Sequence, residues 1–169
     1  MDKISESPWV CYLIQSLDTR HTYIGASNDQ PNRLKNHNNA DPDRKRLGAK
    51  RTAGQTWIPV IIIRGFPDKK SCLSFESGWK RLVRNRKSDR LAMLNILSQK
   101  KIRYTTDPKY NRILDLLYFV HNTTFIGTKF MLNYDMRHPY FDMPNLSIEI
   151  FQEDFFIRSL PWPYFISRI

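Results

Sequence analysis

Residues 9–25, with the sequence WVCYLIQSLDTRHTYIG, decide the fold that we expect for the first part of this chain. Branched and aromatic side chains fill residues 9–16, which is typical of a β-strand with successive side chains on opposite faces. A turn-prone segment follows, and residues 21–25 predict a second short strand. The two strands form a hairpin, which brings Tyr12 and Tyr23 within cross-strand reach.

Downstream of the hairpin, the pattern predicts helices around one further strand. In chain order we expect a capped helix near residues 31–38, a surface loop over 39–55, a strand over 56–65, a helix over 68–84 and helical residues 88–99. The Ile61-Ile62-Ile63 run favours a strand that is buried on both faces, as in the middle of a small sheet. Asp68 is the expected N-cap of its helix. The apolar stripe of that helix is expected to contain Leu73, Trp79, Leu82 and Val83.

The polar, basic segment 100–108 ends in Asp-Pro and marks the domain boundary that we expect. It separates residues 1–108 from a C-terminal extension, residues 109–169. In the extension we expect an apolar helix around residues 113–120, short strands at 129–132 and 146–151, and an aromatic, proline-rich tail at 155–169. The tail either completes a core or offers an aromatic patch to a partner.

Composition limits the class of protein. With 169 residues, 41% apolar and 13% aromatic, the chain supports one compact domain, or one domain plus a small appendage, and excludes a disordered tail. The longest apolar run, residues 57–63, is far shorter than the ~20 residues of a membrane-spanning helix. The N-terminus does not resemble a secretory signal. Only two cysteines are present, so we expect a reducing location: nucleus, cytoplasm or a viral replication compartment.

Charge points to a polyanionic partner. The net charge is +11, and residues 1–108 carry all of the excess, with 21 Lys and Arg against 10 Asp and Glu. Neutralising phosphates releases condensed counter-ions and favours nucleic-acid binding, although a merely soluble basic surface is the simpler alternative. The predicted DNA-binding residues form two clusters: Arg44, Lys45, Arg46, Lys50 and Arg51, and then Lys80, Arg81, Arg84, Arg86 and Lys87, with Arg90 close behind.

Several residues are candidates for a site, although each has a simpler explanation. Glu76 lies on the apolar stripe of its helix, where a carboxylate is costly unless it is paired or holds a cation. The simpler alternatives are an ion pair with a nearby arginine and a side chain at the edge of the stripe that extends its carboxylate into solvent. Arg33 and His37 are four residues apart and share one helix face, which in isolation indicates a solvated surface. Each of Tyr12 and Tyr23 alone indicates packing.

Together these features resemble the GIY-YIG nuclease superfamily. The first motif is present as Val10-Cys11-Tyr12 and keeps only its tyrosine, whereas the second, Tyr23-Ile24-Gly25, is intact. The order of motifs is similar to the catalytic subunit of the eukaryotic Slx structure-selective endonuclease. Its further matches are Arg33-Leu34-x-x-His37-Asn38, Arg51-Thr52-Ala53-Gly54 before Trp57, Gly65-Phe66-Pro67, and Phe75-Glu76-x-x-Trp79. The resemblance implies an α+β fold: a small three-stranded antiparallel sheet flanked by helices, followed by the helical and strand extension.

The same resemblance implies a metal-dependent, structure-selective DNA endonuclease. Its substrates would be flaps, forks or Holliday junctions, met in repair, recombination or replication. The implied catalytic residues are Tyr12, Tyr23, Arg33, His37 and Glu76. In these roles Glu76 holds one Mg²⁺ or Mn²⁺ ion, and Arg33 donates paired hydrogen bonds to the phosphate oxygens. Tyr12 acts as general base, Tyr23 positions the phosphate, and His37 is a second candidate for proton handling.

Partners and alternatives remain open in the sequence. The Slx subunit carries a RING-type zinc domain, but the Cys and His residues here have no paired spacing, so we expect no such domain. This puts the scaffold partner of that family in doubt and favours a minimal, viral version that acts alone, self-associates or uses its extension for a scaffold. Branched duplex DNA is the expected partner, with no membrane. The alternatives are a mobile-element type of GIY-YIG nuclease and a non-catalytic DNA-binding module, and RNA remains a possible substrate.

Overall fold

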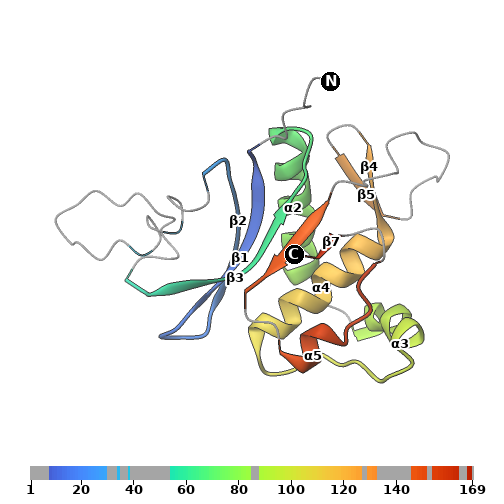
Figure 1. Ribbon diagram of the computed structural model, residues 1–169. Coiled ribbons are helices and arrows are strands. Elements are labelled where there is room, and N and C mark those ends of the chain that lie inside the picture. The colour runs from blue at the N-terminus through green and yellow to red at the C-terminus, as the bar shows by residue number, and fades with distance from the viewer. Residues whose placement is uncertain are drawn as a thin grey trace.

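The computed structural model describes residues 8–29, 34, 38, 54–84, 88–126, 129–132, 146–151, 154–163 and 167–168. Its strands are β1 (Val10–Ser16), β2 (Thr22–Ser27), β3 (Trp57–Arg64), β4 (Thr123–Ile126), β5 (Lys129–Leu132), β6 (Ser147–Ile150) and β7 (Ser167–Arg168). Its helices are α2 (Lys69–Arg84), the 3₁₀ helix η2 (Ser88–Leu91), α3 (Ala92–Ser98), α4 (Pro108–Asn122) and α5 (Phe155–Arg158) (Figure 1).

One sheet organises these elements. Its strand order is β2-β1-β3-β6-β7, antiparallel except for the last pair. The predicted three-stranded antiparallel sheet is confirmed as β2-β1-β3, and β3 is the central strand, with residues 60–63 all buried. The C-terminal extension lengthens this sheet, because β6 pairs with β3, and Arg64 forms an ion pair of 2.8 Å with Glu149 across the two strands. The boundary at residue 108 stays a prediction, and the segments on either side of it share one sheet.

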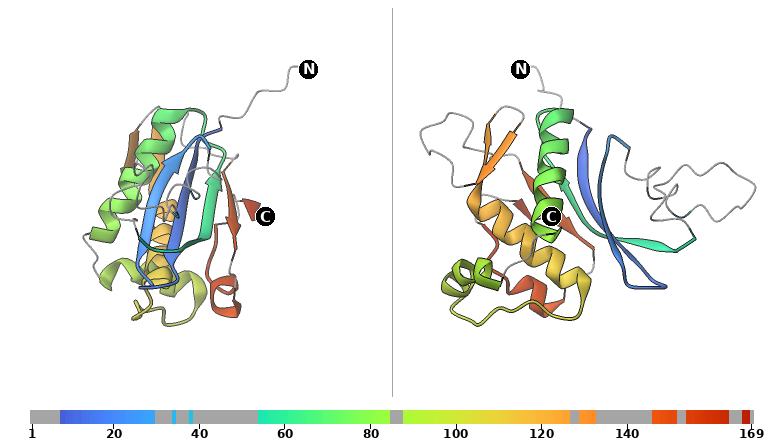
Figure 2. Two further views of the ribbon diagram at one scale, coloured as in Figure 1. Left: turned by 90° about the vertical axis from the view of Figure 1, so that its left-hand side faces the viewer. Right: turned by 180° about the vertical axis from the view of Figure 1, so that it is seen from behind.

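Helices α2 and α4 cover one face of the sheet, as the views from the side and from behind show (Figure 2). The helix predicted at residues 68–84 is confirmed, and of its predicted apolar stripe Trp79 and Leu82 are buried and Val83 packs against the core, whereas Leu73 is not part of it. The buried side chains of α2 that fill the core are Cys72, Phe75, Trp79 and Leu82, whereas Leu73 is 40% exposed. Their spacing of three, four and three residues makes a continuous helical face, and Leu73 lies beside that face.

The two helices approach closely at Gly78. A Cβ at this position would overlap the ring of Phe119 on α4, so glycine provides the space for that ring. Phe119 also packs edge-on against Phe75, with ring centroids 5.0 Å apart. Trp79 donates its indole N–H to the carbonyl oxygen of Arg112 at 3.0 Å. These contacts hold α2 in a fixed position against the sheet and α4.

A second, smaller cluster lies on the opposite face of the sheet. Its buried members are Val10, Tyr12, Ile14, Trp57 and Ile62, with Tyr23 and Leu34 packed against them. Asn38 anchors the chain here, since its amide exchanges two hydrogen bonds with the backbone of Trp57, of 2.5 and 3.0 Å. Within the part of the chain that the structure describes, no helix has the length and apolar character needed to cross a membrane.

Candidate active site

Tyr12 is fixed in the hairpin by its cross-strand neighbour. It lies in the middle of β1, and its partner on β2 is Gly25. The phenol ring passes directly over Gly25, where any Cβ would overlap both the ring and its hydroxyl. Only 2% of Tyr12 is exposed. The intact glycine of the second motif therefore makes room for the tyrosine of the first.

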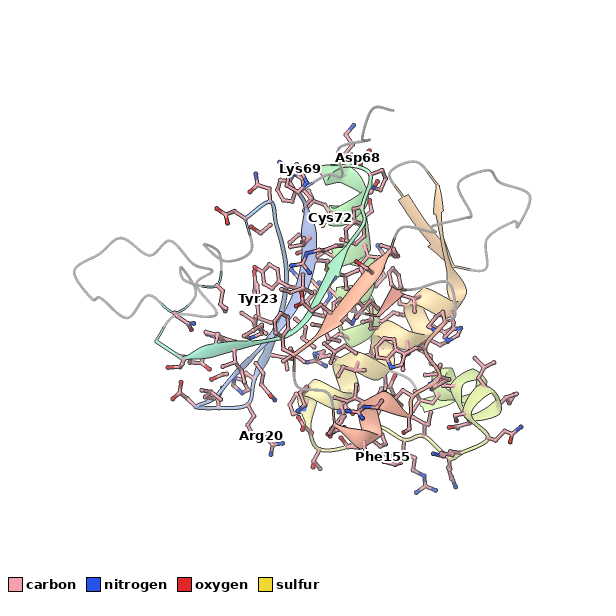
Figure 3. The ribbon with its side chains drawn as sticks, in the orientation of Figure 1. Arg20, Tyr23, Asp68, Lys69, Cys72 and Phe155 are labelled. Atoms are coloured by element: carbon pink, nitrogen blue, oxygen red, sulfur yellow. The ribbon has the colours of Figure 1, made fainter. Side chains whose placement is uncertain are left out.

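Tyr23 lies on β2, the edge strand of the sheet (Figure 3). The ring centroids of Tyr12 and Tyr23 are 6.4 Å apart, which confirms that the hairpin register brings the two phenols together. Tyr23 is half-buried and therefore more accessible than Tyr12. The ammonium of Lys80 lies 5.4 Å from the centroid of the Tyr23 ring, within the range of a cation–π contact. This contact joins the edge of the sheet to α2.

Glu76 completes the group of described site residues. Its Oε1 accepts a hydrogen bond of 2.6 Å from Nζ of Lys80, four residues later on the same helix. The Glu76 side chain is 17% exposed and that of Lys80 is 37% exposed. Glu76 lies at the border of the buried stripe of α2, where its stem packs and its carboxylate still reaches solvent. The simpler explanation of this carboxylate was an ion pair, and the structure confirms one, with lysine instead of arginine as the partner.

The start of α2 is set by its N-cap, which determines where Glu76 lies along the sheet. Asp68 accepts hydrogen bonds from the backbone N–H and the hydroxyl of Ser71, of 2.7 and 2.6 Å, so its predicted capping role is confirmed. Two free cysteines, Cys11 on β1 and Cys72 on α2, are fully buried in the core between the sheet and this helix.

Both thiols lie in an environment that opposes negative charge. Burial, with a smaller contribution from the Glu76 carboxylate, raises the pKa of Cys72 to about 12. Burial, followed by the effects of Cys72 and Glu76, also raises the pKa of Cys11 well above its usual value. Each thiol is therefore neutral at physiological pH and acts as a small apolar side chain beside the candidate site.

The structure thus brings together Tyr12, Tyr23 and Glu76 out of the five predicted catalytic residues. The other two, Arg33 and His37, lie outside the described residues. Among the predicted DNA-binding residues, Lys80 contacts the site residues Glu76 and Tyr23. Arg81 and Arg84 are exposed on the last turns of α2. Those outside the described residues are Arg44, Lys45, Arg46, Lys50, Arg51, Arg86 and Lys87.

Two features of the site were not foreseen. Lys80 was predicted to belong to a DNA-binding surface, whereas in the structure it lies between the Glu76 carboxylate and the Tyr23 ring. Its spacing from Glu76, four residues along one helix, was the signal that could have revealed the ion pair. The amide of Asn38 was noted only as part of a motif, and its hydrogen bonds to Trp57 could not be read from the chain.

The donor set suits a hard cation that keeps most of its water. Among the described residues, no three His, Cys, Asp or Glu side chains gather as a metal-binding group. Glu76 provides a carboxylate side chain that keeps part of its surface in solvent. Mg²⁺ is commonly bound in this manner, through one or two carboxylates with substrate oxygens and waters as the other ligands. The residues present therefore fit one Mg²⁺ or Mn²⁺ ion at Glu76.

Comparison with known proteins agrees with this arrangement. Residues 8–89 match the family model of the GIY-YIG catalytic domain. The chain is 59% identical to a protein of Acanthamoeba polyphaga mimivirus named "Uncharacterized protein L300", over 94% of each chain. It is 31% identical to the structure-specific endonuclease subunit SLX1 of Kluyveromyces lactis, over 83% of this chain and 42% of that protein. For the Candida glabrata subunit of the same name the identity is 30%, over 62% and 40%.

The chain thus spans less than half the length of these SLX1 subunits. The part of this chain that matches the family model contains Tyr12, Tyr23 and Glu76. The match to the family model begins just before β1 and ends within η2, so it contains β1, β2, β3 and α2. Over residues 8–89 the chain therefore matches the GIY-YIG catalytic domain, and it is similar to structure-specific endonuclease subunits over part of their length.

Proposed function

We propose that this chain is a metal-dependent, structure-selective endonuclease that hydrolyses phosphodiester bonds in branched DNA. The observation that supports it most strongly is the grouping of two phenols, an ammonium and a half-buried carboxylate where the edge of the sheet meets α2. A binding surface for DNA needs cations, but it has no use for a carboxylate at its centre. The SLX1 names of the relatives, structure-specific endonuclease subunits, agree with the proposal.

Glu76 is the residue that would hold the metal ion. When bound, Mg²⁺ or Mn²⁺ offsets the negative charge that develops on the phosphate oxygens. The contacts that position Glu76 come from the fold itself: the Asp68 cap sets the start of α2, and Phe75 and Trp79 anchor the turns on either side of the carboxylate. The carboxylate is therefore pre-oriented before any ligand arrives.

The different exposure of Tyr12 and Tyr23 suggests different roles for the two phenols. Tyr12 is the expected base from the family resemblance, but it is 2% exposed, whereas Tyr23 is half-buried and has a cation near its ring. We therefore assign contact with the attacking water or the phosphate to Tyr23, and we assign to Tyr12 the positioning of Tyr23. Arg33 and His37 keep their proposed roles in phosphate binding and proton handling.

DNA would be held mainly through its phosphates. Arg81 and Arg84 extend the positive charge of Lys80 along α2, and the cluster of residues 44–51 lies on the chain segment between β2 and β3. Two separate basic clusters that grip two duplex arms would favour branched DNA over linear duplex. Charge reversal of Arg81 and Arg84 should then impair cleavage of branched DNA more than that of linear duplex, and equal loss on both would contradict the two-arm arrangement.

The test is cleavage of a labelled panel of flap, fork, four-way junction and linear duplex in Mg²⁺, with native protein and Glu76→Gln. A matched control is Glu149→Gln, which removes a carboxylate that also accepts from a cation, Arg64, but on β6. We expect cleavage of branched substrates by the native protein and the control, and loss of at least about a hundredfold in Glu76→Gln. Intact DNA with salt-sensitive binding would instead indicate a DNA-binding module.

The assignment of the phenols has its own test. Tyr23→Phe should lower the single-turnover rate of cleavage more than Tyr12→Phe, because only Tyr23 is placed to contact the substrate. If Tyr12→Phe causes the larger loss while the thermal unfolding midpoint is unchanged, Tyr12 is the base that the family resemblance implies.

The extension offers the surface for any protein partner. Residues 109–169 would support a homodimer or a scaffold contact, since Phe155 is 81% exposed and Phe156 is 39% exposed on the short helix α5. Light scattering on the purified chain distinguishes a monomer from a dimer, and a dimer that persists after Phe155→Ser would exclude this surface from self-association.

A further inference from the structure

Lys80 occupies the position from which a cation neutralises Glu76. Its Nζ lies 2.6 Å from Oε1 of the carboxylate and 5.4 Å from the centroid of the Tyr23 ring. Both side chains of the ion pair retain solvent contact, 37% for Lys80 and 17% for Glu76. The ammonium and a metal ion would therefore compete for the same carboxylate, because two cations held on it repel one another.

The ion pair is of a kind that can exchange partners. A lysine ammonium is a compact charge on a flexible four-carbon stem, and a partly exposed pair with a carboxylate is weak. Lys80 also belongs to the basic face of α2, next to the exposed Arg81 and four residues before the exposed Arg84. A DNA phosphate brought to this face would be an alternative anion for the same ammonium.

We propose that Lys80 is an exchangeable counter-ion: it pairs with Glu76 in the free protein and moves to a DNA phosphate in the complex, which frees the carboxylate for the metal ion. This inference rests on the proposed function. In the free protein Lys80 is a positioning residue that keeps the carboxylate oriented. DNA binding and metal binding then support one another through one side chain, and by thermodynamic linkage the coupling works in both directions.

A lysine that only binds DNA would behave differently. Its removal would weaken DNA binding and leave metal binding to the free protein unchanged. Removal of an exchangeable counter-ion would instead tighten metal binding to the free protein, because the competing ammonium is gone. The two roles therefore predict different results in an experiment that involves neither DNA nor catalysis.

The experiment measures Mn²⁺ binding to the free protein by electron paramagnetic resonance, for native protein, Lys80→Gln, Lys80→Arg and Arg81→Gln. Arg81→Gln is the matched control, since it removes the adjacent cation on the same helix. We expect Lys80→Gln to bind Mn²⁺ about three- to tenfold more tightly than the native protein, and Arg81→Gln to bind it as the native protein does. Lys80→Arg keeps the charge and should stay close to the native affinity. Thermal unfolding midpoints verify that each variant is folded.

A second measurement tests the coupling to DNA. The Mg²⁺ concentration for half-maximal cleavage of a flap should fall as the DNA concentration rises in the native protein and in Glu149→Gln, the control variant on β6, and should change less in Lys80→Gln. Equal Mn²⁺ affinity of Lys80→Gln and Arg81→Gln, in a native protein that cleaves DNA, would overturn the exchange and leave the proposed function intact. A native protein that cleaves none of the substrates would overturn the proposed function, even where Lys80→Gln binds Mn²⁺ more tightly.

Discussion

The phenol ring of Tyr12 lies across the backbone of Gly25, its direct partner on the neighbouring strand. The glycine is needed here for space, since even a methyl group would overlap the ring and the hydroxyl. The two motif halves are therefore linked sterically, with the glycine of one motif accommodating the tyrosine of the other. Any change at residue 25 acts on the position of Tyr12, and through it on Tyr23.

Gly25→Ala should destabilise the protein by about 1–3 kcal/mol, because the added methyl group overpacks a position that the Tyr12 ring already fills. Urea unfolding measures this cost. In a Tyr12→Leu background the shorter side chain no longer reaches across β2, and the same substitution should cost much less. An equal cost in both backgrounds would show that the two residues are not coupled.

Gly78→Ala tests the approach of α2 to α4. In an exposed helix interior this change would stabilise by about 1 kcal/mol, since alanine is the better helix former. Here the new methyl group meets the ring of Phe119, and we expect net destabilisation instead. Phe119→Leu should relieve the overlap, so that Gly78→Ala becomes neutral or stabilising in that background. Net stabilisation by Gly78→Ala in the native background would contradict this packing.

Asp68→Ala should lower the free energy of unfolding by about 1 kcal/mol, because the first turn of α2 loses its side-chain acceptor for Ser71. Asp68→Asn is the control, since its amide oxygen can still cap the helix, and it should stay within a few tenths of a kcal/mol of the native value. Chemical denaturation measures both. A loss in Asp68→Asn equal to that in Asp68→Ala would indicate that charge matters more than the hydrogen bonds.

The buried thiol of Cys72 predicts a loss of stability in alkaline solution. Its pKa is about 12 in the folded protein, raised mainly by burial, against 9.0 for an ordinary exposed cysteine. Below pH 9 both states keep the proton; above it the unfolded chain releases the proton first, so stability falls towards pH 12, by at most about 1.4 kcal/mol per pH unit for this thiol. Cys72→Ala should show a shallower decline in urea titrations between pH 8 and pH 10. An unchanged slope would assign the decline to other groups.

Local patterns were sufficient for much of the fold. The hairpin, the buried strand β3, the Asp68 cap and helix α4 all follow from short-range rules: a period of two, an isoleucine run, a capping side chain and a long apolar segment. The apolar stripe of α2 was misplaced by one residue position at Leu73. Burial depends on which side of the helix meets the sheet, and this is a property of the packed structure.

The motifs along the chain are sufficient to predict the type of domain and its site side chains, because their spacing places Tyr12, Tyr23 and Glu76 on neighbouring elements. The contacts between these side chains depend on how the sheet and α2 pack. The passage of Tyr12 over Gly25, the unequal exposure of the two phenols and the position of Lys80 between Glu76 and Tyr23 all arise where the edge of the sheet meets α2. The extension of the sheet by β6 also depends on packing, since β6 pairs with β3 from far along the chain, and the side chains of Arg64 and Glu149, 85 positions apart, form an ion pair across the two strands. Such contacts depend on packing in three dimensions, which a local pattern does not contain.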